Sequence, residues 1–436
     1  MIWSPAKLAA AGIALWLFVR VVAPVEERIP MDFWATSFIV LCYLAFFVGV
    51  ALEPVVRSKP SVAAGTLALS SQYATRPLVL LVATVVGLIG FVFRYIDRVY
   101  LRAVDYSLEA AAIREQLETA DASVFGMIGA IMLPACYLPA LLLIGTKRKG
   151  GLKHLWWALP LFAVPVVEAV AQLSRSVFLV AAALMFVTLV AQRFEGNPFK
   201  PKLIIYSIIT LIALAMFSSA IFSTRLDNVG MTLEYSIMNS VYAQVIGPDT
   251  TAIEGIHSGD DTKRLWYAAV VPNSLYLVSG LYEFSVLWNR PDEQYFMFGA
   301  YNLETYVRVL ELVTGLEIMP VYAESAMYRT GIFSSFFGPL WVDVGWFSPI
   351  AMVVFGYFVG RLADTARYKS FHWRPLYFLL ATTVIYFPVL NVLTFGQGTF
   401  MFTAFVIYGV AMEVGRYRGE IAPAIESNGD FRKTGF

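Results

Sequence analysis

The sequence predicts an all-α polytopic membrane protein with about ten transmembrane helices, and three observations lead to this fold class. Of the 436 residues, 58% are hydrophobic and only 14% are charged, and the mean hydropathy is +0.67; in soluble domains about a quarter of residues are charged. Apolar runs recur along the chain, and lysines concentrate in the short connections between them. The net charge of +1 gives no reason to expect a nucleic-acid partner.

The individual helices follow from the length of each apolar run, because a bilayer crossing needs about 20 apolar residues. Ten segments qualify: 6–23, 33–52, 77–94, 124–145, 155–173, 176–192, 203–222, 338–360, 375–393 and 399–415. The first is followed by the sequence PVEER and has no small-residue cleavage site. We therefore expect it to be a retained helix and not a signal peptide.

Basic residues in the short loops predict the orientation. With the N-terminus in the cytoplasm, the basic loops 57–76, 146–154, 193–202 and 361–374 and the C-terminal tail all lie inside, and both termini are cytoplasmic. On the opposite side Lys263 is the only lysine, whereas arginines are numerous: Arg28, Arg94, Arg98, Arg102, Arg114, Arg175, Arg225, Arg264, Arg290, Arg308 and Arg329. Arginine is suited to forked binding of phosphate and carboxylate, although each of these residues has loop acids as alternative partners.

Segment 265–288 is long enough to cross, but a crossing there would place the basic loop 361–374 outside. We therefore expect a helix or helix pair, broken near Pro272-Asn273, that lies on or dips into the outer membrane surface. Residues 223–337 then form one large outer loop with amphipathic helices, inserted between the seventh and eighth crossings of a single integral domain, 1–436. Loops of this length are usually functional or disordered, and the aromatic content argues against disorder.

The inner loops are too short for a nucleotide-binding domain, and the sequence has no Gly-rich phosphate loop, no HExxH and no DxD pair. Cys42 and Cys136 both lie in apolar runs, so they predict neither a disulfide framework nor a metal site. We expect no metal and no cofactor. Any reaction would take place at the outer face, on a donor that already stores its energy in a membrane-borne form.

Candidate site residues gather at the outer helix ends. If the chain before Arg175 is helical, Glu168, Gln172 and Arg175 share one face, and Arg175 lies at the turn between two crossings. Arg225 lies at the corresponding outer end of the seventh crossing. Two arginines at one depth could clamp a lipid diphosphate. Two alternatives stay open: Arg175 pairs with Glu168, and Arg225 is a solvated interfacial anchor.

A third candidate is Asp343, which lies between two tryptophans where the eighth crossing begins. A carboxylate there can be a helix cap favoured by the helix dipole. It can also position an acceptor hydroxyl or organise an arginine such as Arg329. His257 is the only histidine on the outer side, in a turn with no evident partner, so we do not expect an obligatory histidine base.

Three passages within residues 85–416 resemble the bacterial oligosaccharide repeat-unit polymerases, the Wzy-type O-antigen or capsule polymerases. They are YIDR followed by a loop that reaches Arg114, the Ser-Arg-Ser turn at Arg175, and VDVG ending at Gly345, which is similar to the family's Asp-Phe-Gly. This chain has Val344 where the family usually has phenylalanine. The acid and the glycine of that passage are intact.

The resemblance implies a GT-C-like membrane glycosyltransferase at the periplasmic face of the bacterial inner membrane that needs no metal. Its reaction would move a growing glycan from undecaprenyl diphosphate onto the non-reducing end of another lipid-linked repeat unit. The implied partners are the lipid-linked oligosaccharide as donor and acceptor, the lipid bilayer, a chain-length regulator and a flippase.

Preorganised arginines would stabilise the charge that develops on the departing diphosphate. Under this resemblance Arg175 and Arg225 would be the diphosphate ligands, and Asp343 would be an organiser or weak base. The further substrate-binding candidates are Arg114, Arg329, Arg290, Arg308, Tyr328 and Glu168. For Arg308, Glu304 and Glu311 offer a simpler explanation as ion-pair partners on a helix surface.

Two other functions remain as alternatives. An O-antigen ligase would pass the glycan to a lipid A core, but that family's motif relies on an outer-face histidine that is not well placed here. A lipid-linked glycan flippase or transporter predicts internal repeats and ionisable residues near the middle of the membrane. We find no repeat, and the predicted crossings are nearly free of charge at mid-membrane.

Overall fold

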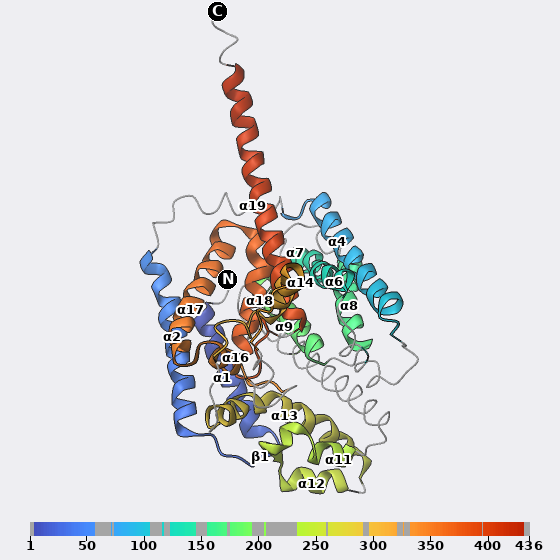
Figure 1. The fold of residues 1–436 in the computed structure, drawn as a ribbon, viewed down its shortest axis with the longest axis vertical. Coiled ribbons are helices and arrows are strands. Elements are labelled where there is room, and N and C mark those ends of the chain that lie inside the picture. Colours follow the sequence, from blue (N-terminus) through green and yellow to red (C-terminus); the bar gives the residue numbers. More distant parts are fainter. Residues whose placement is uncertain are drawn as a thin grey trace, which may run out of the picture.

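The computed structural model describes residues 4–56, 71, 74–104, 116, 123–144, 155–171, 175–193, 205, 233–258, 260–290, 296–320, 326, 332–394 and 396–430. These residues are mostly helical (Figure 1). The helices and strands are α1 (Pro5–Val22), β1 (Val25–Glu27), α2 (Phe33–Val56), α4 (Pro77–Tyr95), η1 (Ile96–Leu101), α6 (Val124–Met132), η2 (Leu133–Tyr137), α7 (Leu138–Ile144), α8 (Leu155–Ala171), α9 (Arg175–Arg193), α11 (Leu233–Met238), η4 (Val241–Gln244), β2 (Ile246–Pro248), α12 (Thr250–His257), α13 (Asp261–Trp288), α14 (Glu304–Thr314), α16 (Phe337–Val344), η5 (Gly345–Phe347), α17 (Ser348–Asp364), η6 (Thr365–Lys369), η7 (Phe371–Trp373), α18 (Arg374–Ile385) and α19 (Gly396–Asp430).

Six helical stretches in the described part of the chain are long and apolar enough to cross a membrane: Pro5–Val22, Phe33–Glu53, Pro77–Leu101, Val124–Ile144, Phe337–Lys369 and Gln397–Gly415. The chain is therefore an all-α membrane protein, as the composition predicted. The shorter apolar helices α8 and α9 match the predicted crossings 155–173 and 176–192. The predicted crossing 203–222 falls outside the described residues, apart from residue 205.

Two crossings, α2 and α17, pack side by side along their length (Figure 1). The ring of Phe38 lies 5.8 Å from that of Trp346 near one end, and Glu53 lies 3.6 Å from Arg361 near the other. The residue numbers rise together, so the helices are parallel. Their backbones come so close that a Cβ at Gly49 would lie 2.1 Å from a carbonyl oxygen of α17. Small residues allow such contacts between membrane helices.

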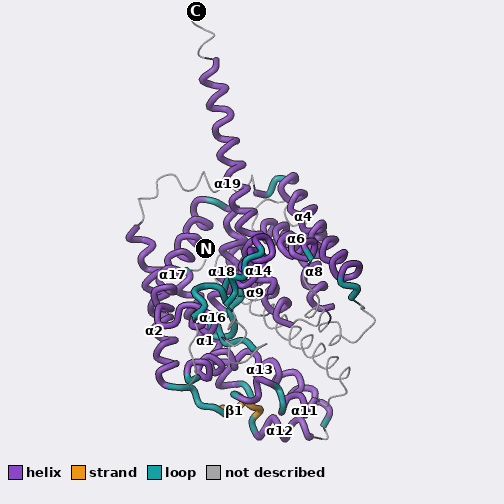
Figure 2. The backbone as a smooth tube through the Cα atoms, viewed as in Figure 1, coloured by secondary structure: helices purple, strands orange, loops and turns teal. Residues whose placement is uncertain are grey.

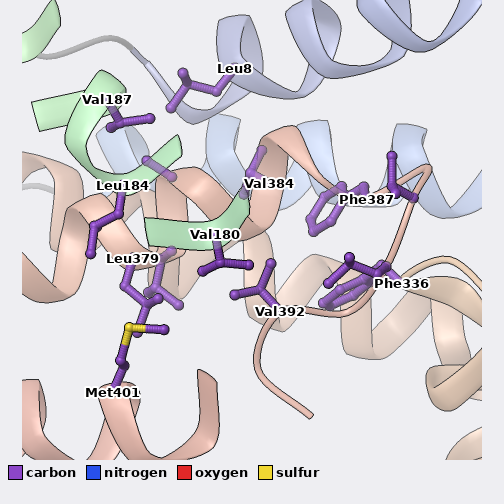
Figure 3. Packing of buried hydrophobic residues seen from close by; sticks show 14 of the residues in the cluster. Leu8, Val180, Leu184, Val187, Phe336, Leu379, Val384, Phe387, Val392 and Met401 are labelled. Carbon is purple, nitrogen blue, oxygen red and sulfur yellow. The ribbon is translucent and has the colours of Figure 1, made fainter. Parts of the chain in front are cut away.

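The core surrounds α18, in which every residue from 375 to 384 is buried, and all of these are apolar or aromatic except Thr382 and Thr383. Figure 3 shows side chains of α1, α9, α18 and α19 meeting there. We predicted a crossing over 375–393, but α18 ends at Ile385 and turns follow. Its 12 residues span about 18 Å. The turn residues pack against α13, where a Cβ at Gly280 would lie 2.4 Å from the carbonyl oxygen of Val389.

Helix α13 corrects our prediction for 265–288. It is continuous through Pro272, and the Asn273 side chain donates a hydrogen bond to the Ala269 carbonyl one turn back. The predicted break was therefore wrong. In Figure 1 this helix runs across the molecule whereas α2 and α17 run along it. Its second half is enclosed by protein, with Val278 and Phe284 fully buried.

A two-stranded antiparallel sheet fixes residues 246–248 against residues 25–27, at the end of α1. Figure 2 shows this pair at the same end of the molecule as α11 and α12. Nearby, Tyr282 of α13 donates a hydrogen bond to Glu27, and Arg20 pairs with Glu27 at 2.6 Å. These two contacts hold the pKa of Glu27 below its usual range. The sheet and this cluster join α13 to the connection between α1 and α2.

Candidate functional site

The structure describes part of the predicted site. Arg225, Arg114, Arg329 and Tyr328 lie outside the described residues. Arg175 is the first residue of α9, and α8 ends at Ala171, so Arg175 stands between two helices as predicted. Its side chain is outside the described part. Glu168 belongs to α8 and Arg175 to α9, and Gln172, the third member of the predicted helical face, lies outside the described residues.

Glu168 is the centre of a buried cluster of charged groups. It lies in the last turn of α8 and is 8% exposed. Its Oε1 accepts a hydrogen bond from Arg94 Nε at 2.7 Å, and Arg98 Nη1 lies 2.7 Å from the same oxygen. Gln397 Nε2, at the start of α19, donates to Oε2 at 3.3 Å. Two guanidinium groups and one amide thus hold this carboxylate in place.

Local helix geometry brings the two arginines to Glu168. Arg94 is in the last turn of α4, and Arg98 lies in the π-helical turn η1 that continues it. Such π turns are rare and occur frequently at functional sites. Arg98 is 6% exposed. A buried guanidinium is tolerated when a carboxylate compensates it, and Glu168 supplies that charge.

A second acid in η1 extends the cluster. Asp97 lies 3.1 Å from Arg102 Nε and accepts a hydrogen bond from Ser123 Oγ, which caps the start of α6. A Cβ at Gly126 would lie 2.5 Å from this carboxylate, so glycine there allows the close approach. Together with Glu168, the group contains three arginines and two acids. These side chains meet where α4 ends and α6 begins.

Asp343 has a different environment, although it is also buried, at 1% exposed. Its Oδ1 accepts from the Tyr301 backbone N–H at 2.9 Å, and its Oδ2 accepts from the Asn302 backbone N–H at 2.8 Å. The Asn302 side chain also donates to Oδ2 and accepts from Asn391 Nδ2 at 2.8 Å. Burial, with the charges of Glu304 and Asp343, raises the pKa of Tyr301 to about 12. Because it accepts hydrogen bonds from the backbone N–H groups of Tyr301 and Asn302, Asp343 anchors the turn that leads into α14.

Two polar residues that are close in sequence reach the two clusters. Asn391, in the connection between α18 and α19, donates to the Asn302 side chain that bonds Asp343, and Gln397, in the first turn of α19, donates to Glu168. The remaining described candidates are Arg308 and Arg290. Arg308 is exposed on α14 and lies 3.8 Å from Glu304 and 3.9 Å from Glu311, whereas Arg290 follows the end of α13.

Sequence reasoning missed several of these residues. Arg94 was recognised only as an outer-side arginine, Arg98 only as one of these and as part of the YIDR passage, and Gln397, Asn302 and Asn391 were not singled out. The available signal was polar residues in an otherwise apolar stretch, such as the glutamine of Gly396-Gln397-Gly398. Within the described residues no three His, Cys, Asp or Glu side chains gather as metal ligands do.

The comparisons with known proteins give no family, because no protein-family model, no curated protein and no solved structure matches this chain.

Proposed function

We propose that this protein is a metal-independent membrane glycosyltransferase that polymerises oligosaccharide repeat units carried on undecaprenyl diphosphate. The growing chain would leave its lipid diphosphate and join the non-reducing end of an incoming lipid-linked unit. The setting would be the periplasmic face of the bacterial inner membrane, with a GT-C-like architecture. A flippase that delivers the units and a chain-length regulator would be its partners.

The observation that supports this most is the arginine cluster around Glu168. The ends of α4 and α8 and the starts of α6 and α19 meet there, with three arginines against two acids. Arg94 contacts Glu168 through Nε, and its two terminal amino groups have no carboxylate partner among the described residues. Amino groups fixed in this way suit a diphosphate, whose negative charge grows as the glycosidic bond breaks.

Roles follow from this placement. Arg175 begins the helix after α8, close in sequence to Glu168, and we propose it with Arg225 as a diphosphate ligand. Arg114, Arg329, Arg290, Arg308 and Tyr328 are proposed as further substrate contacts. Glu168 would be a positioning residue, because it holds Arg94 and Arg98. Asp343 would organise the acceptor side by fixing the turn at Tyr301 and Asn302.

The proposed orientation places the arginine cluster outside and both termini in the cytoplasm. Support comes from the far end of α17, where Arg361, Arg367, Lys369 and Arg374 follow one another within fourteen residues. Basic residues concentrate on the cytoplasmic side of membrane proteins. The ends of α4 and α8 and the start of α17 would then all be periplasmic.

The direct test is polymerisation by purified protein in nanodiscs, supplied with a synthetic undecaprenyl-diphosphate oligosaccharide. We expect a ladder of products from the unaltered protein. Arg175→Lys keeps the charge but loses the forked geometry, so the rate should fall by at least about tenfold. Arg308→Lys is the matched control, since Arg308 is exposed and paired on a helix surface. Full turnover by Arg175→Lys contradicts the diphosphate role.

Deletion of the gene in the source bacterium separates the alternatives. Loss of a polymerase leaves single repeat units on the surface and removes the long ladder. Loss of all attached glycan would favour a ligase. Purified protein that moves the lipid-linked unit across a vesicle membrane without forming a glycosidic bond would favour a flippase.

A further inference from the structure

The outward side of the α2–α17 pair is apolar along its length. On α2 the exposed residues Val40, Leu44 and Val48 follow one another at four-residue spacing, one turn apart. On α17 Ile350 and Val354 continue this pattern. Figure 1 shows α2 at the edge of the molecule, with α17 as its main neighbour.

The two ends of this apolar side differ in chemistry. At the end where both helices begin, Phe33, Trp34, Trp346 and Phe347 are exposed, each by 65% or more. At the other end Glu53 meets the half-exposed Arg361. Aromatic side chains gather at the membrane–water boundary, and arginines extend their charged groups toward it.

The spacing between these ends matches one bilayer. From Trp34 to Glu53 the helix rises about 28 Å at 1.5 Å per residue, and from Trp346 to Arg361 the shorter partner rises about 23 Å. The hydrocarbon core of a typical bilayer is about 30 Å thick. On α2 the midpoint falls at Leu44, and on α17 the midpoint between Trp346 and Arg361 falls at Val354.

We propose that the α2–α17 pair forms a lipid-contacting side of the protein, with one boundary of the hydrocarbon at Trp34 and Trp346 and the other at Glu53 and Arg361. The bilayer itself is the partner, and Leu44 and Val354 lie at its midplane. Asp343 lies close in sequence to Trp346, so its cluster is at the depth of the lipid head groups. This inference needs only membrane insertion and does not depend on glycosyl transfer.

Spin labels test the depths directly. Cys42 and Cys136 are the only cysteines and are fully buried, so an introduced thiol is the reactive one. We would attach a spin label to each of three variants in nanodiscs: Trp34→Cys, Leu44→Cys and Val354→Cys. The relaxation of each label is then measured with oxygen, which concentrates in hydrocarbon, and with a water-soluble nickel complex. We expect the oxygen-to-nickel ratio to peak at Leu44 and Val354 and to fall at Trp34.

Two controls fix the extremes. Glu26→Cys, in the exposed connection after α1, should be relaxed mainly by nickel, and Ala45→Cys, which is buried, by neither agent. Nickel relaxation at Leu44 equal to that at Glu26 would place this side in water and overturn the proposal. An immobile label at Leu44 that neither agent reaches would overturn it as well, by showing that protein covers this side. Size-exclusion profiles establish that each labelled protein is folded.

Discussion

Glu168 and Asp343 are both buried acids at helix ends, yet they are stabilised in opposite ways. Two guanidinium groups compensate Glu168, whereas three neutral N–H donors surround Asp343. The role of Glu168 therefore depends on its negative charge, because removing that charge takes a carboxylate partner away from two arginines. Asp343 depends on geometry, because each oxygen fixes one N–H of a turn. Glu168 holds two positively charged side chains in place, and Asp343 fixes the conformation of a backbone turn.

Removal of the Glu168 charge should have the largest effect. Glu168→Ala leaves Arg94 and Arg98 without their shared carboxylate in a buried site, which costs about 3–5 kcal/mol of unfolding free energy. The measurement is reversible unfolding in detergent micelles with increasing denaturant. A loss below about 1 kcal/mol would mean that the two arginines do not depend on Glu168.

A smaller effect is expected from Asp343→Asn. The amide turns an N–H toward the N–H donors of Tyr301 and Asn302, at a cost of about 1–3 kcal/mol. The loss should be local, so hydrogen exchange of these two backbone amides should accelerate while α4 stays protected. Glu168→Gln is the matched comparison. Faster exchange at Tyr301 in that variant too would show that the two clusters are not independent.

Asn391, in the α18–α19 connection, and Gln397, in the first turn of α19, allow a finer test of the difference between the two clusters. Asn391→Ala and Gln397→Ala each remove hydrogen bonds and should cost about 1 kcal/mol. In double-mutant cycles Gln397→Ala should couple with Glu168→Gln, and Asn391→Ala with Asp343→Asn, each by at least about 0.5 kcal/mol. Strong coupling of the crossed pairs would instead show that the connection transmits changes between the clusters.

The smallest effect belongs to the exposed ion pairs of α14. Arg308→Ala removes the contacts of an exposed arginine with Glu304 at 3.8 Å and with the partly buried Glu311 at 3.9 Å, so the free energy of unfolding should change by no more than about 0.5 kcal/mol. The same denaturant titration measures it. A loss of unfolding free energy as large as that of Glu168→Ala would mean that burial does not explain the difference between the Glu168 cluster and the ion pairs of α14.

The sequence predicted features that depend on local composition. Apolar length located α1, α2 and α4, and the position of Arg175 between two helices followed from the charge within an apolar run. Pro272 did not break α13: the helix continues, the adjacent asparagine side chain adds a hydrogen bond to the Ala269 carbonyl, and protein encloses the half of the helix that follows the proline. The end of α18 at Ile385 likewise reflects packing of the following turn against α13.

The partners of the two acids could not be predicted in this way, because they come from distant parts of the chain. Glu168 meets Arg94 across 74 residues and Gln397 across 229, and Asp343 meets Tyr301 across 42. No periodicity within one helix carries information about such pairs. The sequence shows which side chains can donate hydrogen bonds, but only the fold determines which donors lie beside Glu168 and Asp343.

The parallel packing of α2 and α17 restricts the topology of the whole protein. Helices that cross a membrane in the same direction begin on the same side, so the chain between them must return to that side. It follows that the chain crosses the bilayer an odd number of times between the end of α2 and the start of α17. The predicted segments supply five crossings there. If all five predicted segments cross, a crossing by α13 would be a sixth and would bring α17 in from the opposite side, so under that prediction the path of α13 begins and ends on one side of the membrane.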